Sequence, residues 1–171
     1  MEATAKESLL SARDRCIDQL AGGRVGWVQR MREQGAVRFR ERGFPQSTDE
    51  DWKYTSVRPI ERRAFDCAVS TSSALGSGEL ASFSISGLRS HRLVFVNGYL
   101  ARDLSQLDGV ASGVVVGSLA DALDRDPDAV EPYLGRITPS DAHGFTALNS
   151  AFLADGAYVR LGAAARVELP I

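Results

Sequence analysis

The dipeptide Asn97-Gly98 is the feature that most restricts how this chain folds. Asparagine and glycine both accept positive φ, which the two central positions of a type I′ turn require. Apolar residues flank the pair on both sides, at 93–96 and 99–101. The pattern predicts a β-hairpin with a two-residue loop over 93–101.

Helical periodicity surrounds the hairpin, so we predict an α+β chain. The first helix has a Thr4–Glu7 capping box and ends at Gly22-Gly23, and a second runs from Arg24 to Arg42. A Ser47–Glu50 capping box starts a short third helix. Further helices are expected over 119–123, 127–134 and 142–153, with caps at Ser118 and Asp126.

Apolar residues at helical spacing define the expected buried faces. They are Leu9, Ala12, Cys16, Ile17 and Leu20 in the first helix, and Val25, Val28, Met31 and Phe39 in the second. A strand is expected at 114–116, and two short strands around a small-residue turn at 157–171.

Changes in composition divide the chain into four predicted segments. Residues 1–65 form a helical segment and 66–90 a Ser/Gly-rich linker, exposed and mobile. Residues 91–156 form an α/β segment with the hairpin, and 157–171 begin a further β region. Because the chain stops within apolar β sequence, we expect a continuation past Ile171.

Charge excludes several classes of partner. Lys and Arg number 20 against 22 Asp and Glu, so the net charge is −2 and the chain carries no overall basic field. Six arginines in 24–42 fit a solvated helix face better than a phosphate-binding one. We therefore expect no nucleic-acid partner, and a nucleic-acid-binding helix around Arg30 to Arg42 stays a further alternative. Apolar runs are too short for a membrane span, and no membrane association is expected.

The two cysteines, Cys16 and Cys67, are too few and too far apart for a structural zinc site. They could form one disulfide, but no secretory signal precedes them. A reduced protein in the cytoplasm is the expectation, with Cys16 as a small buried apolar residue. The acidic residues between 121 and 131 lack the spacing of a calcium loop.

His143 is the one side chain that suggests catalysis. Ser140 and Asp141 are near it in sequence, but neighbours in sequence rarely converge into a catalytic triad. Polar residues at a helix start are the simpler interpretation. A stand-alone small-molecule-binding or hydrolytic α+β domain that uses His143 stays the alternative function.

Three ordered segments carry an identifiable pattern, at 44–55, at 93–100 with 116–123 and 131–135, and at 145–156. Together they resemble the N-terminal region of the SufB/SufD family of the SUF iron–sulfur cluster assembly system. The Trp-Lys-Tyr-Thr element is more similar to SufD than to SufB. The motif residues, which we interpret as structural, are Trp52, Lys53, Tyr54, Thr55, Asn97, Gly98, Leu148, Asn149 and Gly156.

The resemblance implies a fold and a role. It implies an N-terminal α/β region followed by a right-handed parallel β-helix, of which 157–171 would be the first strands. It implies a non-catalytic scaffold subunit that meets SufB and SufC, mostly through regions past Ile171. An iron–sulfur cluster is implied for the assembled complex, with no cofactor, metal or catalytic residue in this chain.

Overall fold

A computed structural model gives the structure and describes residues 4–68, 76–138 and 143–171. Internal contacts divide the chain into two units. Unit 1 combines Met1–Cys67 with Leu123–Leu153, and unit 2 combines Ala68–Ala122 with Ala154–Ile171. The predicted 91–156 segment thus contributes to both units, and the four-segment division stays a prediction.

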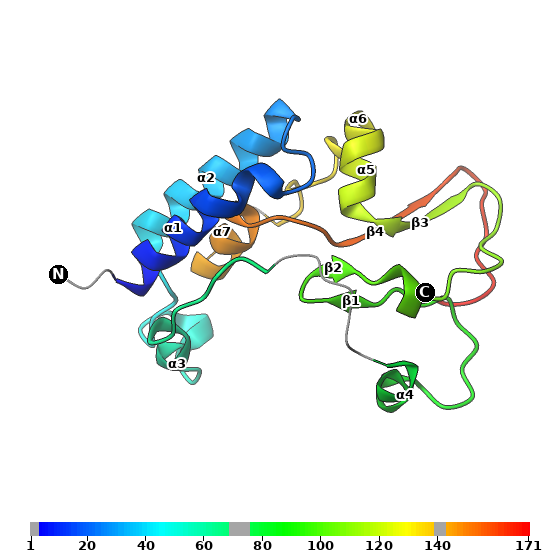
Figure 1. Cartoon of the computed structure of the whole chain (residues 1–171), viewed down its shortest axis with the longest axis horizontal. Coiled ribbons are helices and arrows are strands. Elements are labelled where there is room, and N and C mark those ends of the chain that lie inside the picture. The colour runs from blue at the N-terminus through cyan, green and yellow to red at the C-terminus, as the bar shows by residue number, and fades with distance from the viewer. Residues whose placement is uncertain (1–3, 69–75, 139–142) are drawn as a thin grey trace. The chain divides into compact units, whose positions relative to one another are not determined.

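Unit 1 is helical, and its helices α1, α2 and α7 pack together (Figure 1). Its core contains Phe39, Phe44 and Val57 with two alanines of α7, Ala147 and Ala151. The helices are α1 (Ala5–Cys16), α2 (Gly26–Arg42), α3 (Arg58–Glu61), α6 (Pro127–Val130) and α7 (Gly144–Ala151), with 3-10 turns at Ile17–Gln19 and Glu50–Trp52.

The N-terminal cap of α1 is the predicted capping box. The Thr4 hydroxyl accepts from the Glu7 backbone N–H at 3.3 Å, and the Glu7 carboxylate accepts from the Thr4 N–H at 2.9 Å. The α-helix ends at Cys16, earlier than predicted, and a 3-10 turn follows. Gly22, with φ of 67°, lies in the connection to α2 rather than at the helix end.

Helix α2 follows its prediction closely, with one correction. Val28 and Phe39 are fully buried, and Gly43 ends the helix with a φ of 71°. Met31 and Val25 are only half-buried. The sequence pattern missed Arg32, which is fully buried because its guanidinium finds backbone acceptors inside unit 1.

Two of the predicted caps are wrong. Ser47 and Glu50 form no capping box; the Asp49 carboxylate instead accepts from the Gln46 N–H at 2.9 Å, and only a 3-10 turn follows. The turn begins only at Glu50, so Glu50 is not the third residue of a helix that Ser47 could cap. Asp126 likewise makes no side-chain cap on α6, although Pro127 occupies the first turn as predicted.

Unit 2 contains the predicted hairpin. Strand β1 (Phe95–Val96) pairs antiparallel with β2 (Tyr99–Leu100), with Phe95 opposite Leu100. Asn97 and Gly98 have φ values of 51° and 87°, as the type I′ turn requires. The hairpin prediction is confirmed.

The second sheet joins distant parts of the chain. Strand β3 (Val114–Ser118) pairs antiparallel with β4 (Ala157–Leu161), so that Val116 lies opposite Val159. Helix α5 (Leu119–Arg125) follows β3 directly. Its predicted cap is confirmed, because the Ser118 hydroxyl accepts from the Asp121 N–H at 3.1 Å.

Two predictions for unit 2 need correction. The tail forms one strand, since residues 166–171 have no ladder partner among the described residues. The predicted linker contains helical turns, α4 (Ser77–Leu80) and a 3-10 turn at Ala81–Phe83, while its residues 69–75 lie outside the described residues. The implied parallel β-helix stays a prediction.

Candidate functional site

The Trp-Lys-Tyr-Thr motif is an anchored turn that presents its polar residues outward. The Trp52 ring lies 5.3 Å from the Phe145 ring and 5.8 Å from the His143 ring, centroid to centroid. Lys53 and Thr55 are exposed, and Tyr54 is 92% exposed. Trp52 therefore fixes the turn on the unit 1 core, and the next three side chains face solvent.

The other motif residues are divided between the units. Leu148 packs against the unit 1 core, and Asn149 is exposed on α7. Asn97 and Gly98 form the hairpin turn of unit 2. The Gly156 carbonyl accepts from the Leu119 N–H at 2.8 Å, also in unit 2. The motif residues therefore belong to two folded units.

Asp155 is a structural residue that sequence reasoning missed. Its Oδ1 accepts from the Ser118 hydroxyl at 2.7 Å and from the Ala120 N–H at 2.9 Å, and its Oδ2 accepts from the Leu100 N–H at 3.0 Å. These donors come from β2 and from the start of α5. The carboxylate therefore links β2 in one sheet to Ser118 of β3 in the other.

His143 caps a helix. It is the N-cap of α7, and its Nδ1 accepts from the Thr146 N–H at 3.3 Å. The Thr146 hydroxyl lies 3.3 Å from Nδ1 and 3.1 Å from Nε2, so it is in line with neither nitrogen lone pair. Ser140 and Asp141 lie outside the described residues. The described contacts support the capping interpretation.

Two buried arginines close the C-terminal end of α7. Arg32 Nη2 donates to the Leu153 carbonyl at 2.6 Å, and Arg13 Nε donates to the Ala151 carbonyl at 3.4 Å. Arg13 also pairs with Asp14 and Glu33, each at 2.9 Å. Cations at a helix C-terminus interact favourably with the helix dipole. Both arginines therefore stabilise unit 1.

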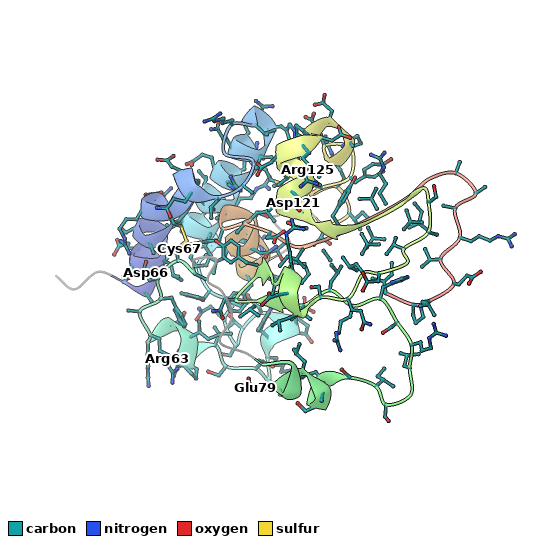
Figure 2. The ribbon with its side chains drawn as sticks, turned by 45° about the vertical axis from the view of Figure 1, so that its right-hand side comes forward. Arg63, Asp66, Cys67, Glu79, Asp121 and Arg125 are labelled. Carbon is teal, nitrogen blue, oxygen red and sulfur yellow. A yellow bond between two sulfur atoms is a disulfide. The ribbon has the colours of Figure 1, made fainter. Side chains whose placement is uncertain are left out.

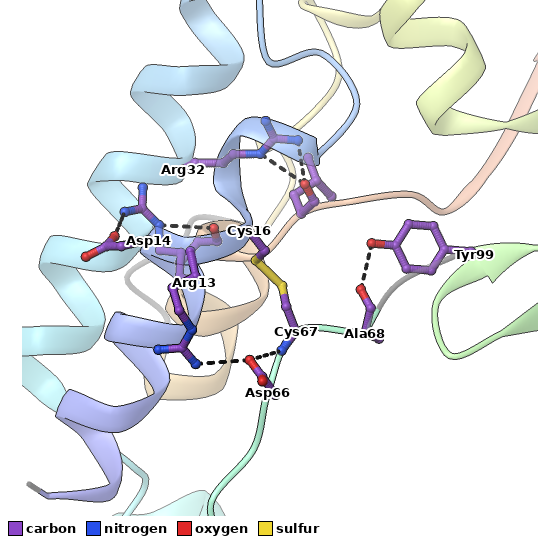
Figure 3. Close-up of a disulfide and its surroundings, with 11 residues drawn as sticks. Arg13, Asp14, Cys16, Arg32, Asp66, Cys67, Ala68 and Tyr99 are labelled. Carbon is purple, nitrogen blue, oxygen red and sulfur yellow. Dashed lines mark hydrogen bonds and ion pairs between the residues drawn. A yellow bond between two sulfur atoms is a disulfide. The ribbon is translucent and has the colours of Figure 1, made fainter. Parts of the chain in front are cut away.

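The structure overturns the expectation of reduced cysteines. Cys16 and Cys67 form a disulfide across 51 residues of sequence, drawn in yellow in Figures 2 and 3. Cys16 is buried as predicted, but α1 brings its Sγ to the segment after α3, a proximity that sequence spacing cannot show. The bridge ties this segment to α1.

An ion pair accompanies the disulfide. The Asp66 carboxylate accepts from the Cys67 N–H at 3.0 Å (Figure 3). It also accepts from Arg15 Nη2 at 3.1 Å. The Cys67 N–H, and after it the Arg15 guanidinium, lower the pKa of Asp66 below its ordinary value of 3.8. The bridged segment is thus also held by charge.

A groove follows one side of α2 in unit 1. One part has a volume of about 450 Å³ and is lined by Arg30, Arg38 and Arg136, with Glu131 as its carboxylate. The adjoining part, about 540 Å³, is lined mainly by apolar residues. We call both parts together the α2 groove; they share Met31, Leu134, Gly135 and Ser150.

The described residues hold no metal centre. Within 4–68, 76–138 and 143–171, His, Cys, Asp and Glu side chains do not gather in groups of three that could hold a metal ion. In the same residues, every helix is too short or too polar to reach across a membrane.

A model of the SufBD protein N-terminal region matches residues 4–171. The chain belongs to the SufBD family. The match covers both units, including the motif residues, so the sequence-based assignment to this family is confirmed.

Curated SufBD relatives agree with this assignment. The chain is 40% identical over 60 residues to the chloroplastic iron–sulfur cluster assembly SufBD family protein ABCI8 of Arabidopsis thaliana, covering 35% of this chain and 11% of that protein. It is 27% identical over 128 residues to the SufBD family protein slr0076 of Synechocystis, covering 75% and 28%. The alignments thus span 11% and 28% of these two relatives' lengths.

Proposed function

We propose that this chain is the N-terminal region of a SufD-like scaffold subunit in an iron–sulfur cluster assembly complex, with no reaction of its own. The observation that carries the proposal is the family match over residues 4–171. The Trp-Lys-Tyr-Thr turn supports the SufD-like assignment. The printed names of the relatives contain the words iron–sulfur cluster assembly, which supports the assembly role.

The proposed partners are SufB and SufC, with the cytoplasm as the proposed location. In this proposal the cluster is the cargo of the complex, and its ligands come from other regions or subunits. The donor set of this chain supports that view, because its two cysteines are both used in the Cys16–Cys67 disulfide. Iron–sulfur clusters are held mainly by cysteine thiolates.

Two binding experiments test the proposal. In the first, the tagged chain is mixed with SufB and SufC. In the second, the same chain fused to the β-helical and C-terminal regions of a SufD protein is mixed with the same two partners. We expect the fusion to retain both partners and the chain alone to lose SufC. Retention of SufC by the chain alone would contradict the proposed division of roles.

Cluster formation provides the second readout. The reconstituted complex is assembled with the fusion or with the same SufD protein lacking the N-terminal region, and the visible absorption of the cluster is followed. We expect the fusion to support assembly. An activity of the isolated chain that His143→Ala abolishes would overturn the scaffold proposal in favour of an enzyme.

A further inference from the structure

The α2 groove has a cationic part and an apolar part in direct continuation. We propose that it binds a short acidic and leucine-rich segment of a protein partner, with carboxylates at the arginines and aliphatic side chains in the apolar part. This inference goes beyond the scaffold role, since it concerns a contact made by this region itself.

Charge is the first argument. Arg30 and Arg136 share the cationic part with one carboxylate, Glu131, so the groove carries an excess of positive charge on a chain whose net charge is −2. Arg30 and Arg136 are exposed, and among the described residues neither forms an ion pair. Guanidinium groups bind carboxylates in bidentate geometry. Two such groups are available to an acidic ligand.

Trp27 provides a second polar observation. Trp27 lines the cationic part, and its Nε1 is a buried donor without an acceptor among the described residues. An unsatisfied buried donor costs free energy that a new acceptor recovers. A carboxylate in the groove would supply that acceptor.

The apolar part of the groove indicates that the partner has aliphatic side chains as well as carboxylates. Tyr133 is 73% exposed and Ile137 is 91% exposed, both beside half-buried Leu134, Phe145 and Leu153. Exposed apolar patches rimmed by polar residues mark binding sites for protein partners. A peptide backbone can carry carboxylates and aliphatic side chains in succession, as this groove requires. A nucleic acid offers phosphates but no aliphatic groups.

The test uses the whole chain and a fluorescein-labelled probe peptide, Glu-Glu-Asp-Glu-Leu-Leu-Ala-Leu, followed by fluorescence anisotropy. We expect saturable binding. The double variant Arg30→Glu/Arg136→Glu should weaken it about tenfold or more, because both guanidinium contacts become repulsive. Ile137→Ser should weaken it about fivefold through lost apolar contact.

Matched controls separate the groove from general charge. Arg40→Glu makes the same change at an exposed position of α2 outside the groove, and we expect its affinity to stay within about twofold of the unchanged chain. A probe with Gln and Asn in place of its acids should bind about tenfold more weakly. Thermal unfolding of each variant confirms that it is folded.

Several outcomes would overturn the inference. They are absence of probe binding, equal binding of the uncharged probe, an equal loss in Arg40→Glu, or unchanged affinity in a folded Arg30→Glu/Arg136→Glu variant. Tighter binding of a single-stranded oligonucleotide would identify a nucleic-acid site instead. None of these results depends on SufB or SufC, so the scaffold proposal is tested separately.

Discussion

Gly35 of α2 lies directly against the backbone of α7 at Ala147. A Cβ built on Gly35 would lie 2.7 Å from the Ala147 carbonyl oxygen and 2.7 Å from the Ala151 nitrogen. Both distances are shorter than van der Waals contact, and both neighbours are backbone atoms that cannot rotate away. The close approach of the two main helices of unit 1 therefore depends on a missing side chain.

Gly35→Ala should lower the free energy of unfolding by about 2–3 kcal/mol, because overpacking at the helix crossing exceeds the gain in helix propensity. Urea denaturation measures the change. Gly26→Ala is the matched control in the same helix, where the added Cβ meets only the Arg30 guanidinium at 3.4 Å. We expect that control to be neutral or slightly stabilising. Equal effects of the two substitutions would contradict the close approach.

Arg32→Met keeps the side-chain volume but removes the donors to the Leu153 and Ala21 carbonyls. Because those buried acceptors lose charge-assisted hydrogen bonds, we expect a loss of about 2–4 kcal/mol in unfolding free energy. Hydrogen exchange of α7 amides should also become faster. Arg40→Met, at an exposed position of the same helix, should change stability by less than about 0.5 kcal/mol. An Arg32→Met variant with unchanged unfolding free energy would contradict the stabilising role of these hydrogen bonds.

Removing the disulfide should destabilise the chain through its unfolded state. A bridge across 51 residues closes a loop whose entropy corresponds to about 4 kcal/mol. Cys16→Ser/Cys67→Ser should therefore unfold at lower urea concentration than the oxidised chain. Reducing agent should lower the midpoint of the unchanged chain and leave the double variant unaffected. Two free thiols in the native, non-reduced chain would show that the bridge is absent.

The Asp66 contacts predict a pH dependence. Hydrogen bonding from Cys67 N–H and charge from Arg15 lower the pKa of the folded carboxyl below its ordinary value of 3.8. A lowered folded pKa contributes stability that is present above the unfolded pKa and is lost as pH falls through the folded pKa. Asp66→Asn should be less stable than the unchanged chain at about pH 6, with the difference vanishing at about pH 2. A difference independent of pH would exclude this linkage.

Features set by neighbours in sequence were predictable. The Asn97-Gly98 turn, the Thr4–Glu7 capping box and the Ser118 cap all form as predicted, because each depends on residues within four positions. The Ser47–Glu50 box does not form, because the turn that follows begins only at Glu50.

Features that join distant residues were not predictable from spacing. Asp155 gathers donors from β2 and α5, Arg32 reaches Leu153 across 121 positions, and β3 pairs with β4. Each contact depends on how the chain folds between the two residues, which the periodicity of apolar residues does not predict. The α2 groove belongs to the same class, since α2 supplies Arg30 and a later turn supplies Arg136.

The sequence by itself determined the family, the hairpin and most helix positions, because ordered motifs and turn residues are written in consecutive positions. Only the tertiary structure decided that Cys16 meets Cys67 and that Arg13 and Arg32 are buried. Those outcomes depend on which backbone atoms packing brings near each side chain, and loop closure over long separations sets them.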